Sequence, residues 1–471
     1  MDFPTLISAL TAAATTLITV LRYMREAENT GEPSRANGKG KPTLPMRKFQ
    51  TAFLTSVIIV GLLMGVVRPL GMLQPSELAA FDYMMRSRPI EQPDSRLLII
   101  TINDDDLEYQ AQKNMERRAA SLSDQALDAL LQKLNPHQPR VIGLDIFRDF
   151  GVNLQFKDLV KQLQENNNLI LTCSIGGIKA SPEIQLAQYQ RLGFSNIPED
   201  PNKVIRRQLL AQTPSSQCYT DQSFSLRIAL RYLETENISP IQQTVDQRLQ
   251  IGTVIFPKLV SDAGGYQLPR TEDLGYQILL NYRSLKPDES IAQQISLTDI
   301  LEGSQDAKLP SLVNNRIVLI GTTARSFRDF HMTPYGTEMP GVLIQAHMVS
   351  QIISAVLNQR PLLWWWPQAV EIIWVWLWAF FVGILIEYWR SPIRRGLVVV
   401  IAISILYGLC RLAFMQGGWL PVIPTILSLF LTGVCVVIAL TYVQITSTTS
   451  STPSAPSTPT TPTTPTTPTN S

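Results

Sequence analysis

The chain has 471 residues, of which 45% are hydrophobic, and its mean hydropathy is +0.07. Its 40 basic and 38 acidic residues leave a formal net charge of +2, and no basic stripe with interleaved aromatic residues occurs, so nothing indicates nucleic-acid binding. Four cysteines are too few for a disulfide-rich scaffold.

The first 48 residues are predicted to be a basic segment in the cytoplasm. Within 1–21, the uncharged stretch is rich in alanine and threonine, and either a weak membrane segment or a helix on the membrane surface fits it. A signal peptide is not indicated, because Asp2 rather than a basic residue precedes the stretch. Residues 49–68 are predicted as a transmembrane helix, since this apolar run can cross about 30 Å of hydrocarbon.

Three more transmembrane helices are predicted within 364–445. They are expected at about 367–386, 396–415 and 420–443. The tail at 446–471 is nearly all threonine, proline and serine. It is predicted to be disordered and cytoplasmic, because it has no side chains that could build a core.

The distribution of basic residues predicts the orientation. Seven lysines and arginines lie between residues 22 and 48, and three arginines lie in the loop at 390–395. Short loops rich in these residues stay cytoplasmic, so residues 69–363 should be extracytoplasmic. All eight tryptophans lie at 364–419, and four of them fall where the outer membrane interface is expected. We therefore expect a multi-pass protein of the cell membrane, in contact with the lipid bilayer.

The extracytoplasmic segment is predicted to be α/β. Continuous apolar runs typical of buried strands occur at 96–102, 140–146, 168–174, 276–282 and 316–321, and a further strand is expected at 249–256. Helical spacing occurs at 122–134, 224–233 and 340–357. The first strand, helix and second strand resemble a βαβ unit, which predicts a parallel pair. The expected fold is a mixed, largely parallel sheet with covering helices, plus about four transmembrane α-helices.

Two cysteines lie in this extracytoplasmic segment, Cys173 and Cys218. An oxidising compartment would permit a bridge between them, but their spacing alone does not show that they meet.

Several segments together carry a family resemblance. They are LLIITINDDDLE at 97–108, LSDQALDALLQKL at 122–134, PRVIGLDIF at 139–147, GFSNIPEDPNKVIRRQLL at 193–210, RIVLIGTTARSFRDFHMTPYG at 316–336 and MPGVLIQAHMVSQIISAVL at 339–357. In order and spacing, residues 75–385 resemble the CHASE domain of the second type, a sensory extracellular domain of bacterial receptors. Three closing membrane spans are also typical of that family.

The resemblance implies a receptor, with some departures. Family members usually carry a cyclase, kinase or protease-like output domain, for which neither the first 48 residues nor the tail offers a sequence. We therefore expect a separate cytoplasmic signalling protein as partner, and the resemblance also implies a homodimer. The family's turn before the paired arginines has a glycine, whereas this chain has Lys203, which puts a positive φ there in doubt.

Polar residues that follow the predicted strands suggest a ligand-binding rim. Asp104 and Asp105 follow the first strand, Asp145 ends the second, and Thr322 and Thr323 follow the strand at 316–321. Ligands of open α/β sheets collect beyond the carboxyl ends of parallel strands. Three readings stay open: a small extracytoplasmic ligand, a hard cation, or ordinary loop and cap chemistry. The loop pattern of a calcium site is absent.

Ionisable groups near the membrane and in the domain suggest further contacts. Glu371 and Arg411 lie within predicted spans, where charges pair or snorkel to the interface, and we hypothesise that they form an intramembrane pair. Arg206 and Arg207 could bind an anion, but we interpret them as facing water. Asp329, before Thr333 and Pro334, is interpreted as part of a structural turn.

No catalytic signature is legible. The chain has no GxSxG, Walker, kinase or HExxH motif, and its three histidines show no metal-ligand spacing. We therefore predict no enzymatic activity, no metal and no cofactor. The leading hypothesis is a non-catalytic membrane sensor, and the alternative is a structural or scaffolding protein of the envelope.

Overall fold

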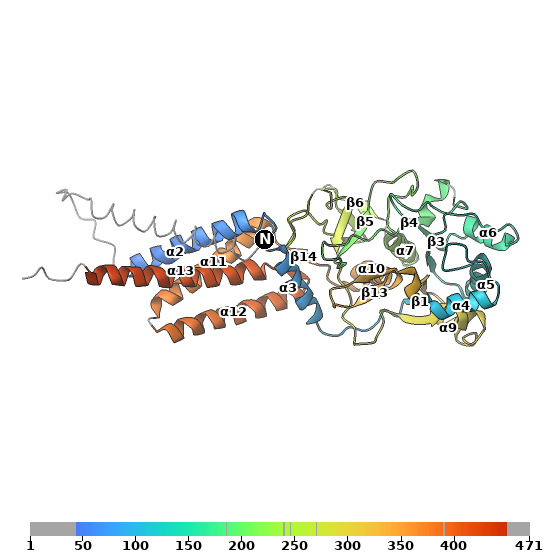
Figure 1. The fold of residues 1–471 in the computed structure, drawn as a ribbon. Helices are drawn as coiled ribbons and strands as arrows, with labels where there is room; N and C mark the ends of the chain where they lie inside the picture. Colours follow the sequence, from blue (N-terminus) through green and yellow to red (C-terminus); the bar gives the residue numbers. More distant parts are fainter. Residues whose placement is uncertain are drawn as a thin grey trace, which may run out of the picture. The chain divides into compact units, whose positions relative to one another are not determined.

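The computed structural model describes residues 44–449 except 185, 239–240, 245, 270 and 390. The segment at 1–21 and the tail from residue 450 therefore lie outside the described residues. The chain divides into two compact units (Figure 1). The sheet unit is Met64–Trp374 with Ile403–Pro424, and the helical unit is the described parts of Met1–Leu63, Val375–Ala402 and Thr425–Ser471.

The sheet unit is built on six strands in the order β10-β1-β11-β2-β3-β4, and every neighbouring pair is parallel. The strands are β1 (Leu97–Ile102), β2 (Val141–Asp145), β3 (Leu169–Cys173), β4 (Leu192–Phe194), β10 (Gln293–Ser296) and β11 (Ile317–Thr322). Strands β1, β3 and β11 are buried throughout, which explains their continuous apolar sequences.

Helices cover both faces of this sheet. One core contains residues of α4 (Asp104–Gln112), α5 (Asp124–Leu134), α6 (Lys157–Glu165), α8 (Leu297–Leu301) and α9 (Leu309–Val313). The other contains residues of α7 (Phe224–Glu234) and α10 (Gly341–Asn358). Figure 1 shows α5 and α6 on one side of β3 and α7 and α10 on the other. Alternate residues of β1 enter the two cores, as the period of a strand requires.

Shorter elements complete the unit. They are α3 (Gln74–Arg86), antiparallel β5 (Arg207–Ala211) and β9 (Tyr276–Leu279), β6 (Gln242–Gln243) with β7 (Leu249–Ile251) and β8 (Val254–Ile255), β12 (Phe330–Met332) with β13 (Glu338–Pro340), and β14 (Trp364–Trp365) with β15 (Gly418–Trp419). The short helical turns are Asn135–His137, Leu186–Arg191 and Arg325–Phe327.

The predicted α/β class is confirmed, with two differences in detail. Strands β1 and β2 do not pair with each other, because β11, from far along the chain, lies between them and is parallel to both. The expected single strand at 249–256 is a hairpin of β7 and β8, because the chain turns at Gly252, whose φ is +58°. A local pattern of apolar residues predicts neither the order of the strands in the sheet nor the position of this turn.

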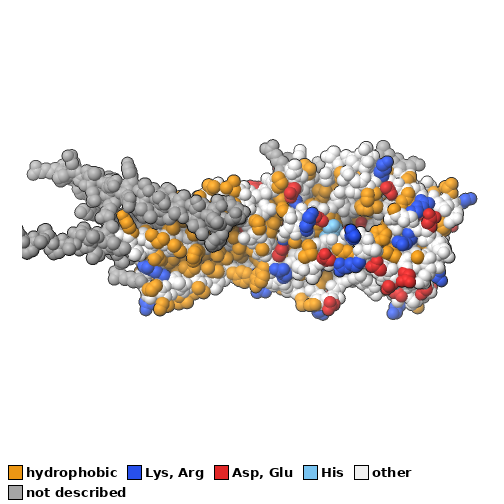
Figure 2. Space-filling model, in the orientation of Figure 1, with side chains coloured by type: hydrophobic (Ala, Val, Ile, Leu, Met, Phe, Trp, Pro, Cys, Tyr) orange, Lys and Arg blue, Asp and Glu red, His pale blue; other side chains and the backbone are white. Residues whose placement is uncertain are grey.

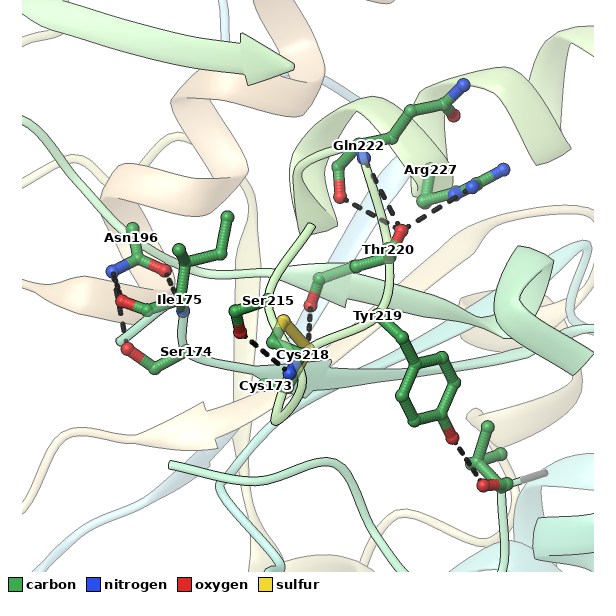
Figure 3. Close-up of a disulfide and its surroundings, with 12 residues drawn as sticks. Cys173, Ser174, Ile175, Asn196, Ser215, Cys218, Tyr219, Thr220, Gln222 and Arg227 are labelled. Carbon is green, nitrogen blue, oxygen red and sulfur yellow. Dashed lines mark hydrogen bonds between the residues drawn. A yellow bond between two sulfur atoms is a disulfide. The ribbon is translucent and has the colours of Figure 1, made fainter. Parts of the chain in front are cut away.

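A disulfide joins Cys173, at the end of β3, to Cys218 in the loop after β5 (Figure 3). The carbonyl of Cys173 also accepts a hydrogen bond from the backbone N–H of Ser195 at 3.0 Å. The bridge and this hydrogen bond together fix the carboxyl end of β3 against two loops.

The paired arginines do not face water, contrary to our interpretation. Arg206 and Arg207 are each 1% exposed. Arg206 pairs with Asp82 of α3 at 2.7 Å and with Asp200 at 2.6 Å, and Arg207 pairs with the other oxygen of Asp200 at 2.8 Å. The turn before the two arginines keeps its positive φ without glycine, since Lys203 has φ 64°. Within the sheet unit, these charges therefore tie α3 to the segment that leads into β5.

The helical unit contains α2 (Leu44–Leu62), extended by a π-helical turn to Val67, and parts of α11 (Gln368–Tyr388), α12 (Pro392–Met415) and α13 (Val422–Thr449). Helix α2 packs on its neighbours through rings, with Phe49 on Phe380 at 5.2 Å and Phe53 on Trp376 at 5.8 Å. Helix α13 continues to Thr449, into the segment predicted as tail. Figure 2 shows mostly hydrophobic side chains on the visible face of these helices.

Five described helices are long and apolar enough to cross a membrane. Four of them are the predicted spans, at Phe49–Val67, Gln368–Tyr388, Pro392–Met415 and Val422–Tyr442. The fifth, α10, is 78% buried because it packs on the sheet and on α7, so we assign it to the core of the sheet unit.

Candidate functional site

A cavity of about 590 Å³ lies beyond the carboxyl ends of the central parallel strands. Asp145 at the end of β2 and Thr322 at the end of β11 line it, together with Gly341 and Gln345 of α10. The remaining walls come from the loop between α4 and α5, from the loops after β2, β3 and β4, and from β12 with the segment before it. The lining residues there are Ala119, Ala120, Ser121, Ile146, Phe147, Asp149, Phe150, Ile178, Ser195, Ile197, Phe327, Arg328, Asp329 and His331.

Asp145 is the partly buried carboxylate of this cavity that lacks a partner. It makes no hydrogen bond or ion pair with any other described residue. Burial raises the pKa of Asp145 to about 7, and the nearby charge of Asp329 adds to this effect, whereas His331 opposes it. The group is therefore positioned to respond to a positive charge that enters the cavity.

His331 lies between two carboxylates. Its Nε2 is 3.2 Å from Oδ1 of Asp329, and its Nδ1 is 3.1 Å from Oε1 of Glu199. The hydrogen bond with Asp329 raises the pKa of His331, burial opposes the shift, and Glu199 adds to it. Because both ring nitrogens face acceptors, the imidazolium, which donates from both, fits this place best.

Gln345 brings an unsatisfied acceptor to the cavity wall. Its side chain is 3% exposed, its Nε2 lies 3.5 Å from the carbonyl oxygen of Ser195, and its Oε1 has no hydrogen-bond partner among the described residues. A buried amide oxygen without a donor costs free energy. Since Gln345 lines the cavity, a bound group that reaches this oxygen with a hydrogen-bond donor would remove the cost.

Helix α10 approaches Asp329 closely where it begins. A Cβ on Gly341 would lie 2.4 Å from Oδ2 of Asp329, and the N–H of Gly341 donates to the Asp329 carbonyl at 3.1 Å. The glycine is therefore needed for the contact between the helix and this carboxylate.

The structure brings two of the five predicted rim residues to the cavity, Asp145 and Thr322. Asp104 instead accepts hydrogen bonds from the Ser326 hydroxyl at 2.8 Å and the Arg325 N–H at 2.9 Å. Asp105 is exposed in the first turn of α4, and Thr323 does not line the cavity. The two hydrogen bonds of Asp104 agree with the reading in which this residue stabilises a loop.

Sequence reasoning missed Asp329, His331 and Gln345 as cavity residues. The signal that could have found them is positional: His331 and Asp329 follow the β11 strand, and Gln345 lies one turn into the helix that follows. Among the described residues, no group of three or more His, Cys, Asp or Glu side chains is arranged to hold a metal ion.

A second charged cluster lies within the sheet unit, and it includes the residue that follows the first span, Arg68, and one from the first turn of α11, Glu371. Arg68 donates to Oε2 of Glu371 at 2.5 Å, to Oε2 of Glu77 at 3.4 Å and to the carbonyl of Gly264. We call Arg68, Glu77 and Glu371 the Arg68 triad; each side chain is at most 2% exposed. Burial raises the pKa of Glu77 to about 7, against the opposing charge of Arg68.

The triad corrects the hypothesis of an intramembrane pair. Glu371 pairs with Arg68, and Arg411 instead donates to the Ser87 carbonyl at 3.1 Å from an exposed position. The physical reason is burial: Glu371 is 1% exposed and needs a buried cation, which the residue just after the first span supplies.

Comparison with known proteins identifies the family. A family model described as the CHASE2 domain matches residues 56–384, more than two thirds of the chain. No curated protein and no solved structure matches this chain. The parallel sheet, the cavity at its carboxyl edge and the apolar helices accompany this match. The chain therefore belongs to the CHASE2 family of extracytoplasmic sensory domains, as part of a multi-pass membrane protein.

Proposed function

We propose that this protein is a non-catalytic membrane sensor that binds a small extracytoplasmic ligand in the Asp145 cavity and passes the change to a separate cytoplasmic signalling protein. The observation that carries the proposal is the unsatisfied acceptor of Gln345 at a cavity beyond the carboxyl strand ends. The charge distribution of the loops supports an outer position for residues 69–363, and the disulfide is in keeping with an oxidising compartment.

Helix α10 offers a physical route from the cavity toward the membrane. Its first turn lines the cavity, and its 18 residues extend for about 27 Å. Just beyond its end, Arg360 pairs with Glu91 at 2.7 Å and donates to the Asn281 carbonyl at 2.9 Å, and α11 begins at Gln368. A ligand that binds one arrangement of α10 more tightly than another would shift the second span with it.

The test uses full-length protein in lipid nanodiscs and the small-molecule fraction of a cell extract. Exposed Ala119 lines the cavity, so Ala119→Trp fills it, whereas exposed Ala111 on α4 does not line it, and Ala111→Trp is the matched control. We expect the extract to raise the thermal unfolding temperature of the wild type and of the control, but not of Ala119→Trp. An extract that stabilises none of the three, or all of them equally, would favour a structural role in the envelope.

A further inference from the structure

We infer that the ligand of the Asp145 cavity is a small organic cation with an apolar portion, bound through the N–H groups of an ammonium or guanidinium. Its donors would go to the carboxylates of Asp145 and Asp329 and to Oε1 of Gln345. The inference rests on the proposed function, because it names the chemical class of the ligand of the same site.

The charge of the cavity favours a cation. Asp145, Asp149 and Asp329 line the cavity, and the basic side chains among its lining residues are Arg328 and His331. His331 pairs directly with Asp329 and Glu199, and its effect on Asp145 is smaller than that of burial and of Asp329. The carboxylate of Asp145 thus forms no ion pair with a described residue, and a cationic ligand would supply one.

Gln345 selects for a donor. An amide oxygen accepts hydrogen bonds and cannot donate them, so the partner that Oε1 lacks is an N–H or O–H donor, which a ligand in the cavity lined by Gln345 can bring. A carboxylate or phosphate ligand would place oxygen acceptors against this oxygen and against Asp145, which is unfavourable on both counts. The buried unsatisfied amide and the unpaired carboxylate therefore point to the same class of ligand independently.

The rest of the wall argues for an organic ligand rather than a bare metal ion. The cavity of about 590 Å³ is in the range of small-molecule sites. Ile146, Phe147, Ile178 and Ile197 give it an apolar side, and no set of three metal-ligating side chains occurs within the described parts of the chain. An amine that carries a hydrocarbon or aromatic group would place its ammonium against the carboxylates and its apolar part against the apolar side of the cavity.

The experiment compares three probes that share a phenethyl group, namely phenethylamine, phenethyl alcohol and hydrocinnamic acid, with calcium chloride as a fourth. Full-length protein in nanodiscs is titrated at millimolar probe concentrations, and thermal unfolding and calorimetry report binding. We expect phenethylamine to bind, and the alcohol, the acid and calcium to bind at least about tenfold more weakly. The alcohol lacks the charged hydrogen bond of the ammonium, the carboxylates repel the acid, and calcium has no N–H donor.

Two isosteric variants locate the effect. Asp145→Asn should weaken phenethylamine binding by about tenfold to hundredfold. Asp105→Asn, on an exposed carboxylate outside the cavity, should leave it unchanged. Three outcomes would overturn the inference: tighter binding of the acid, the alcohol or calcium, equal effects of the two variants, or no binding of phenethylamine. If the extract of the preceding experiment still stabilises the wild type and not Ala119→Trp, the proposed sensor survives and only its ligand class is wrong.

Discussion

Replacing Arg68 with methionine tests how strongly the Arg68 triad stabilises the sheet unit. Methionine keeps the length and apolar stem of arginine but removes its charge and donors. The substitution leaves Glu77 and Glu371, 2% and 1% exposed, without a cation, and it also removes the donor to the Gly264 carbonyl.

The expected cost follows from the burial of the partners. Removing one member of a buried ion pair destabilises a protein by about 3–5 kcal/mol, because the remaining charge is uncompensated. Protonation offsets part of this cost: the pKa of Glu77 is already about 7 through burial, and the loss of Arg68 removes the charge that opposes the rise. We therefore expect a loss of about 3 kcal/mol at mildly alkaline pH and a smaller loss at acidic pH.

The assay is the free energy of unfolding of full-length protein in nanodiscs, followed by tryptophan fluorescence. Arg411→Met is the matched control, because Arg411 is exposed and donates to the Ser87 carbonyl, so its loss should cost less than about 1 kcal/mol. Adding Glu77→Gln and Glu371→Gln to Arg68→Met should recover part of the stability. Equal effects of Arg68→Met and Arg411→Met would refute the reasoning.

The remaining predictions concern pH, the disulfide and one glycine. Because the folded-state pKa of Glu77 is raised, its stabilisation is present below about pH 4.5 and is lost as the pH rises through about 7; Glu77→Gln should make the measured decline less steep. Reducing the disulfide, which closes a separation of 45 residues, should lower the free energy of unfolding by about 4 kcal/mol in a denaturant titration. Gly341→Ala places a Cβ 2.4 Å from Asp329 and should cost about 1–3 kcal/mol and weaken stabilisation by the extract. Gly396→Ala, with no atom within 4 Å, should change neither, and equal effects of both alanines would argue against the contact.

Much of the fold could be predicted because its signals are local. The buried strand β1 is a continuous apolar run, and α5 begins where its cap indicates, with Ser123 accepting from the Ala126 N–H at 3.0 Å. The order of the strands could not be predicted, since β11 pairs with β1 across more than two hundred residues. Such a pairing depends on the packing of the whole domain.

The site was predictable where topology determines it. The rule for parallel sheets led to Asp145 and Thr322, and both line the cavity. Gln345 escaped notice because a polar residue on an apolar helix has no periodic signal of its own. Arg206 looked like a surface residue because its partner Asp82 lies 124 positions earlier in the chain. Buried polar partners of this kind are found through tertiary contacts.

The most direct test of the sensor is mild crosslinking of the full chain in its native membrane, followed by affinity capture and mass spectrometry, with the wild type and Ala119→Trp compared. The account predicts a cytoplasmic kinase, cyclase or other signalling enzyme in stoichiometric amount, with a crosslinking pattern that the cavity-filling variant changes. Recovery of the chain alone or of envelope proteins, with identical patterns for both variants, would contradict it.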